Sequence, residues 1–334
     1  EATGLTLLGD TGFSGTVPPS GSLRRNVTVQ AEQPGQALLK LTAAGSEGKD
    51  ALEMTFPVLA RALQREQAAA LSLRNGQAQT MLTQPGSALP DSGSITATFS
   101  PTVVDSLIPA LEYLISFPYG CVEQTVSRFV PAVYAQQMLT AQGRNLSPTL
   151  QAKLPQIVTE GLQRLADLQH ADGGWGWWKN DSTNPHLTAL AMQGLATAKR
   201  AGITLDQQLV QRGIKAIESQ LDKARPEQAA VLYRALTAHG GNHPEAEKRL
   251  IDGLTSLPPE AKIAVAEALD NRGQRQRAAQ ILKGLQALLQ QDSEAAWLPE
   301  NETGWRWGGS SLETTAALLS ATSRIMPEDA TSAA

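Results

Sequence analysis

One cysteine and one glutamine stand three residues apart in the segment Phe117-Pro118-Tyr119-Gly120-Cys121-Val122-Glu123-Gln124-Thr125. The segment lies where a turn gives way to a helical pattern. Residues three apart on a helix have side chains on the same side, with Cβ atoms about 5–6 Å apart. A thiol that faces a carboxamide can displace ammonia and form an internal thioester, which acylates amines and hydroxyl groups. Cys121 and Gln124 are therefore candidates for this bond.

A thioester survives in water only if its site is dry and walled by apolar rings. Phe117, Tyr119 and nearby tryptophans are candidates for such a wall, and Gly120 allows a close backbone approach. Two other roles of Cys121 stay open. It could be a buried, inert cysteine, or a thiolate nucleophile activated by the helix end and a histidine. No motif of a cysteine protease surrounds it.

Length and composition limit the class of protein. The chain has 334 residues, of which 41% are apolar and 18% charged, with a net charge of -4. It is long enough for a buried core and too apolar for a disordered chain. The mild negative charge argues against a nucleic-acid partner. A single cysteine excludes an intramolecular disulfide and a multi-cysteine zinc site, and neither a metal nor a cofactor is predicted.

The sequence contains no apolar run of about 18 residues that could cross a bilayer. It also shows no signal peptide. Residue 1 lies inside a plausible domain, so we expect a piece of a longer protein whose targeting segment has been removed.

The first hundred residues have short alternating runs separated by turn-rich clusters, a pattern typical of an antiparallel sandwich. The runs cover residues 22–30, 36–43, 52–58, 70–73 and 95–99. They are too few for two complete sandwiches. After Pro101 apolar residues recur at helical spacing instead. About ten helices joined by short loops are predicted between Asp105 and Ile325.

A weak internal repeat occurs within the helical part. Gly174-Trp175-Gly176-Trp177 precedes a helix that begins near Leu187-Thr188-Ala189, and Gly304-Trp305-Arg306-Trp307 precedes one near Glu313-Thr314-Thr315-Ala316. A repeated loop and helix indicates helices stacked in a ring or solenoid. The tryptophans themselves are interpreted as structural wedges between layers.

These motifs resemble those of a known family. Tyr119-Gly120-Cys121-Val122-Glu123-Gln124 resembles the thioester signature of the α2-macroglobulin and complement family, and the aliphatic residue after the cysteine is similar to bacterial members. Residues 55–62 resemble the end of a macroglobulin-like β domain, and the next forty resemble the first half of a CUB-like β domain. Residues 170–178 with 187–189 are similar to a second motif of bacterial thioester domains.

The resemblance implies an α+β multidomain chain. Residues 1–58 would end a macroglobulin-like β domain and residues 59–103 would begin a CUB-like β domain, both sandwich portions. Residues 104–334 would form the thioester domain, an all-α α/α toroid, complete or lacking its last part.

The resemblance also implies a single-use covalent protease inhibitor and not an enzyme. A protease cuts a bait segment, the molecule rearranges, and the exposed thioester acylates a lysine or another nucleophile of that protease. Cys121 would supply the sulfur and Gln124 the acyl carbon, while Glu123 would orient the motif or cap the helix. Tyr119, Trp175, Trp177 and His186 are candidates for shielding or packing, although a loop or surface histidine is the favoured interpretation of His186.

Further implied partners are other domains of a longer protein, which would shield the thioester. Bacterial relatives are typically lipoproteins of the periplasm, so a lipid anchor to the inner membrane is expected for the full-length form. No bait segment is recognisable in these residues.

Two other functions stay open. Residues 168–176 also resemble the repeat of toroidal terpene cyclases and protein prenyltransferases. A cyclase needs an acidic cluster, which the sequence lacks, and a prenyltransferase needs an Asp/Cys/His zinc site that would compete for Cys121. The third possibility is a non-reactive interaction scaffold with an inert cysteine.

Overall fold

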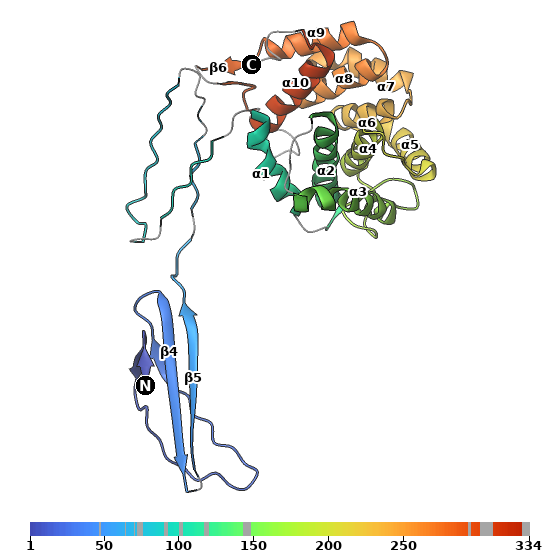
Figure 1. Ribbon diagram of the computed structural model, residues 1–334. Coiled ribbons are helices and arrows are strands. Elements are labelled where there is room, and N and C mark those ends of the chain that lie inside the picture. The colour runs from blue at the N-terminus through green and yellow to red at the C-terminus, as the bar shows by residue number, and fades with distance from the viewer. Residues whose placement is uncertain are drawn as a thin grey trace. The chain divides into compact units, whose positions relative to one another are not determined.

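The computed structural model describes the chain except residues 47, 64, 70, 72–75, 90–92, 100–102, 117–119, 143–147, 293–294, 301–309 and 329–334. Its residues divide into two compact units, Glu1–Thr96 and Ala97–Ala334 (Figure 1). The first unit contains β-strands and the second is almost entirely helical.

The N-terminal unit contains two small antiparallel sheets. One has the strand order β1-β4-β5, and the other pairs β2 with β3. The strands are β1 (Ala2–Thr3), β2 (Thr6–Leu8), β3 (Thr28–Gln30), β4 (Gly35–Gly45) and β5 (Gly48–Val58). The predicted runs at 36–43 and 52–58 lie in β4 and β5, which pair in a register that places Leu41 opposite Leu52.

The predicted sandwich is not found among the described residues of this unit. Ala37 is the one buried residue of β4, whereas Leu52 and Met54 on β5 are 53% and 39% exposed. These apolar side chains have no second layer to cover them in the described part of the unit. The described residues of 59–99 form no strand, and the run at 70–73 lies largely outside the described residues. The CUB-like assignment of 59–103 therefore remains a prediction.

Ten α-helices follow among the described residues, which confirms the number predicted from periodicity. They are α1 (Val103–Ser116), α2 (Val122–Gln142), α3 (Pro148–Leu168), α4 (Pro185–Arg200), α5 (Gln207–Leu221), α6 (Pro226–Ala238), α7 (Pro244–Asp252), α8 (Pro259–Asn271), α9 (Arg275–Gln286) and α10 (Ser311–Ile325). The described residues also form a short 3₁₀ turn, η1 (Leu254–Ser256), and a two-stranded pair, β6 (Gln290–Gln291) with β7 (Ala296–Trp297). Five of the helices begin at a proline, whose fixed φ suits the first helical position.

The helices alternate between two layers (Figure 1). Helices α2, α4, α6, α8 and α10 pack against one another in sequence, and α3, α5, α7 and α9 each pack against one or two of them. The sequence explains this division. Helices α4, α6 and α8 are buried around most of their circumference, whereas α5, α7 and α9 bury a single stripe. Many alanines in the first group let the helix axes approach closely.

The contact between α2 and α3 depends on a glycine. A Cβ added to Gly161 on α3 would lie 2.8 Å from Cβ and 2.9 Å from Cδ2 of the fully buried Phe129 on α2. Gly161→Ala is therefore expected to lower the free energy of unfolding by about 1–3 kcal/mol, because overpacking outweighs the gain in helix propensity.

Denaturant unfolding measures this change. The matched control is Gly284→Ala on α9, where an added Cβ would have nothing within 4 Å; it should raise stability by roughly 1 kcal/mol. If Gly161→Ala were stabilising like its control, the described packing of α2 on α3 would be wrong.

Candidate functional site

Cys121 lies directly before the first residue of α2. Its carbonyl accepts the backbone N–H of Thr125 at 3.0 Å and the Thr125 hydroxyl at 2.9 Å, so it accepts the first bond of the helix. The residue is 6% exposed and its thiol is free of any disulfide. The helix thus begins where the sequence predicted, and the cysteine that precedes it is almost fully buried.

Gln124 folds back over the turn that precedes its own helix. The Cys121 backbone N–H donates to Oε1 of Gln124 at 3.2 Å. Gly120 leaves room for this conformation, because an added Cβ there would lie 1.8 Å from Oε1 and 3.0 Å from Cδ of Gln124. The carboxamide therefore lies against Gly120 and the backbone of Cys121.

Two distant residues fix the backbone of this turn. Nη2 of Arg164, on α3, donates to the Gly120 carbonyl at 3.2 Å. The Val122 N–H, one of the donors that a helix start leaves unpaired, donates to the Trp177 carbonyl at 3.1 Å. Sequence reasoning missed Arg164, because it lies among the apolar stripe of α3 and no spacing relates it to Gly120. The contact of Trp177 is made by its backbone, which no residue pattern could indicate.

Glu123 does not contact the cysteine through any described hydrogen bond. Its Oε1 accepts the Ser127 hydroxyl at 2.8 Å, one helical turn along. The carboxylate lies in the first turn of α2, where the helix dipole favours a negative charge. Its predicted orienting or capping role stays a prediction.

The loop of residues 169–184, here called the tryptophan loop, is held by Trp175. This side chain is fully buried, and its Nε1–H donates to the Leu165 carbonyl at 2.8 Å. Its backbone N–H donates to the Thr188 hydroxyl at 3.0 Å, and its carbonyl accepts the Asn184 N–H at 2.8 Å. Trp175 therefore joins α3, the loop and α4, which agrees with its interpretation as a wedge.

The other predicted shielding residues differ in placement. Trp177 is half-buried and packs against the core, whereas Trp178 is 54% exposed. Tyr119 and the second tryptophan motif at 304–307 lie outside the described residues. Shielding of the Cys121 site by the Trp175 and Trp177 rings remains a prediction.

His186 is the second residue of α4, and its N–H donates to the capping Asn184 Oδ1 at 2.9 Å. Burial, and then the positive charge of Arg234, lower the pKa of His186. The imidazole is therefore neutral near neutral pH. No described contact joins its ring to Cys121 or Gln124.

The described part of the chain contains neither a candidate metal cluster nor a helix that could cross a membrane. His170, Asp167 and Asp172, which the sequence brings near one another, have protein partners. Asp167 accepts from Gln163, and Asp172 accepts from Gly174 and Thr183. No group of three or more His, Cys, Asp or Glu side chains suited to a metal occurs among the described residues. Within those residues, none of the helices is both long and apolar enough to cross a membrane.

The chain is similar to known proteins. The family model "A-macroglobulin TED domain" matches residues 96–239. An α2-macroglobulin of Thermotoga maritima is 33% identical over 229 residues, which are 67% of this chain and 13% of that protein. Thioester-containing protein 1 (allele R1) of Anopheles gambiae is 26% identical over 132 residues, or 39% of this chain and 10% of that protein.

Solved structures share the fold. The crystal structure of Salmonella α2-macroglobulin reacted with methylamine aligns with a TM-score of 0.54 at 19% identity, over 97% of this chain and 22% of that chain. The native E. coli α2-macroglobulin determined by cryo-electron microscopy aligns with a TM-score of 0.52 at 20% identity, over 97% and 21% of the two chains. The present chain therefore spans a small part of the length of these proteins.

Proposed function

Because the chain belongs to the α2-macroglobulin family, we propose that Cys121 and Gln124 form an internal thioester that acylates one nucleophile and is consumed. The observation that carries this proposal is the back-folded Gln124, with its carboxamide against the turn of a buried, free cysteine. The identity of the two residues and their helical spacing supply the required atoms.

Formation of the bond requires attack of the Cys121 sulfur on Cδ of Gln124. The S–C bond forms, the C–N bond breaks, and ammonia leaves with the thiol proton. The negative charge that develops during attack falls on Oε1, which accepts the Cys121 N–H at 3.2 Å. A fixed donor at that oxygen stabilises the transition state in the same manner as an oxyanion hole.

Consumption of the bond follows the same path with a different nucleophile. An amine attacks Cδ, the sulfur leaves as a thiol, and residue 124 keeps the amine as a substituted amide. The amine stays attached to residue 124 and is not released as a product, so each thioester is consumed by one nucleophile. This is the behaviour of a covalent reagent and not of a turnover enzyme.

Intact mass tests the proposal directly. A thioester makes the freshly purified chain about 17 Da lighter than its sequence mass, since ammonia is lost. A chain whose thioester has hydrolysed is about 1 Da heavier than its sequence mass, because residue 124 is then a glutamate. Methylamine should add to the first form and release one thiol. A chain at its unmodified sequence mass with one free thiol would contradict the proposal.

The variant Gln124→Glu supplies both the control and a prediction. It should fold like the wild type, because Gln124 is only half-buried, but it should take up no methylamine, since a carboxylate lacks the leaving group. Its mass is the reference for the hydrolysed wild type. Gln207→Glu, in the first turn of α5, is the matched control and should take up methylamine as the wild type does. Equal labelling of Gln124→Glu and wild type would exclude Gln124 as the acyl group.

For the longer protein we propose protease trapping. The relatives are several times longer than this chain, which covers 13% of the Thermotoga protein, so bait cleavage and thioester shielding would belong to other domains. The resemblance to bacterial members supports a lipid-anchored form in the periplasm. The two helix layers support an arc of an α/α toroid. A protease adduct of the full-length protein that resists denaturation, and that is lost in Cys121→Ala, is the expected result.

A further inference from the structure

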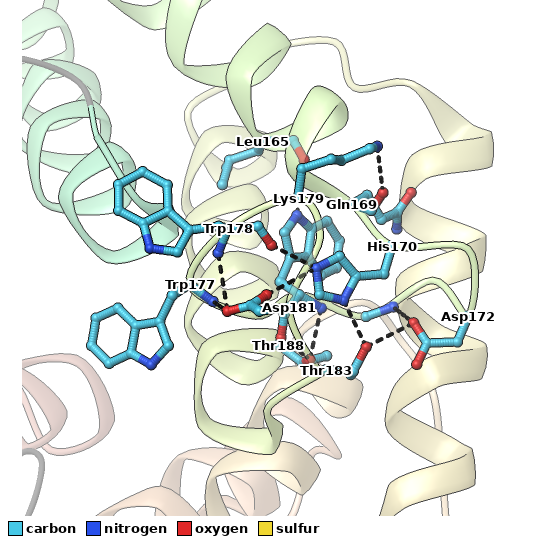
Figure 2. A network of polar contacts seen from close by, with 12 residues as sticks. Leu165, Gln169, His170, Asp172, Trp177, Trp178, Lys179, Asp181, Thr183 and Thr188 are labelled. Atoms are coloured by element: carbon cyan, nitrogen blue, oxygen red, sulfur yellow. Dashed lines mark hydrogen bonds and ion pairs between the residues drawn. The ribbon is translucent and has the colours of Figure 1, made fainter.

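The tryptophan loop reaches the start of α2 through one backbone carbonyl, and a histidine lies behind that carbonyl. Trp177 accepts the Val122 N–H at 3.1 Å. The backbone N–H groups of Trp177 and Trp178 donate to Oδ2 of Asp181 at 2.7 and 3.2 Å. The other oxygen of Asp181 lies 3.3 Å from Nε2 of His170, whose side chain is 8% exposed. Figure 2 shows this ring between Asp181 and Thr183.

Nε2 of the His170 ring must carry a proton. Nε2 of His170 lies 2.8 Å from the Trp178 carbonyl oxygen. A carbonyl oxygen can only accept a hydrogen bond, so Nε2 is the donor. The Asp181 carboxylate at 3.3 Å is a second acceptor on the same side of the ring.

Nδ1 of His170 faces the Thr183 hydroxyl, which already donates its proton to another acceptor. Nδ1 lies 2.9 Å from Oγ1 of Thr183, and that hydroxyl donates to Oδ1 of Asp172 at 2.9 Å. Partial burial opposes ionisation of Asp172, but hydrogen bonds from the Gly174 N–H and the Thr183 hydroxyl, with the charge of His170, lower its pKa. The carboxylate therefore only accepts. Since a hydroxyl has one proton, Nδ1 must donate to Thr183.

We infer that His170 carries a proton on both ring nitrogens and, as an imidazolium, positions the tryptophan loop against the first turn of α2. The cation is balanced by two carboxylates, Asp181 directly and Asp172 through Thr183 (Figure 2). A buried cation without such partners would be strongly destabilising.

Two other charged groups lie close by and bond to backbone carbonyls. Arg212, on α5, donates to the His170 carbonyl at 2.6 Å, and Lys179 donates to the Gln169 carbonyl at 2.9 Å. The positive charges of Arg212 and Lys179 disfavour a positive charge on the His170 ring. The negative charges of the two aspartates offset this effect. The loop is thus fixed at residues 169 and 170 by cations and at residues 177 and 178 by Asp181.

His170 is a positioning residue in this scheme, since it acts on Cys121 only through the loop. His170 contacts Asp181 and the Trp178 carbonyl. Asp181 holds the backbone of Trp177, and Trp177 contacts Val122, the residue after Cys121. This last step rests on the proposed thioester. If the imidazolium is lost, the Trp177 carbonyl is less firmly placed, the first turn of α2 opens more often, and water reaches the thioester sooner.

Nitrogen chemical shifts of the histidine rings test the charge on the whole ¹⁵N-labelled chain. The chain has four histidines, and replacing each in turn assigns its signals. Near neutral pH both ring nitrogens of His170 should show the protonated signature. Thr183→Val removes the acceptor at Nδ1, so His170 should become the neutral tautomer with its proton on Nε2. Thr159→Val, at an exposed hydroxyl on α3, should leave the His170 signals unchanged.

Two results would overturn the inference. One is a neutral His170 ring in the wild type near neutral pH. The other is a doubly protonated ring that persists in folded Thr183→Val. The wild-type spectrum decides the charge even if Thr183→Val does not fold.

Mass spectrometry over time tests the link to the thioester. Loss of the thioester to water should be faster in Thr183→Val than in Thr159→Val, on the order of tenfold. Equal rates would refute the positioning role. A wild type that never loses ammonia would refute the proposed function, while the ring measurement would still decide the charge of His170.

Discussion

Gly120→Ala is expected to prevent thioester formation almost completely while the chain still folds. An added Cβ would lie 1.8 Å from Oε1 and 3.0 Å from Cδ of Gln124. Both atoms belong to the end of a flexible side chain, so Gln124 can turn away. The cost in stability is then about 1 kcal/mol, the value of the lost hydrogen bond between Cys121 and Gln124. Turning away, however, removes the Gln124 carboxamide from its position against the Cys121 backbone, from which we propose that the thioester forms.

Intact mass and denaturant unfolding together check this prediction. The Gly120→Ala chain should have its full sequence mass, one free thiol and no methylamine uptake. Gly284→Ala on α9 is the control, since nothing lies within 4 Å of its added Cβ. A Gly120→Ala chain that still loses ammonia would show that the back-folded Gln124 is not required. A chain that unfolds outright would show that Gly120 serves the fold and not the site.

Trp175→Ala is expected to have the largest effect on stability. The ring is fully buried, its Nε1–H satisfies the Leu165 carbonyl, and it lies where α5 approaches through Gly213, whose added Cβ would be 3.2 Å from Cζ3. Removal leaves a cavity and an unpaired carbonyl. Large-to-small changes of this kind cost about 3–5 kcal/mol, which would unfold a marginally stable domain.

Trp178→Ala is the matched change in the same loop. Its ring is 54% exposed, and it contacts His170 through its carbonyl, which alanine retains. We expect the free energy of unfolding to change by about 0.5 kcal/mol or less. If the two variants were equally destabilised, the loop would not be held by Trp175 as described.

Local spacing predicted the parts of this molecule that depend on neighbours in sequence. The positions of Cys121 and Gln124 on one side of a helical turn follow from helix geometry, and the apolar stripes gave the number of helices. Tyr134 is an exception, because it continues the stripe of α2 but is 49% exposed. The sandwich prediction depends on more than local spacing. Alternation identifies a strand, but only a second layer of side chains makes a sandwich, and the described residues of the N-terminal unit contain none.

The histidines also have partners that local sequence patterns do not predict. From sequence, His186 was the one histidine among the candidates for shielding or packing, and it lies in the tryptophan-rich motif. In the structure His186 is a half-buried, neutral residue at the start of α4, while His170 is linked through Trp178, Asp181 and Thr183 to the loop that contacts α2. No periodicity relates the ring of His170 to these partners, because they meet only when the loop has closed.

Four properties of this protein follow from the sequence without its fold: the cysteine and the glutamine that we propose to react, their separation along one helical turn, the glycine beside them and the helical class of the C-terminal unit. These properties are set by covalent geometry and hydrogen bonds within a few residues. The roles of Arg164 and Trp177 in fixing the turn, and of Trp175 in anchoring the loop, are visible only in the folded chain. Each of these depends on contacts between segments far apart in the chain, and chain packing brings those segments together only as the apolar faces of the helices are buried.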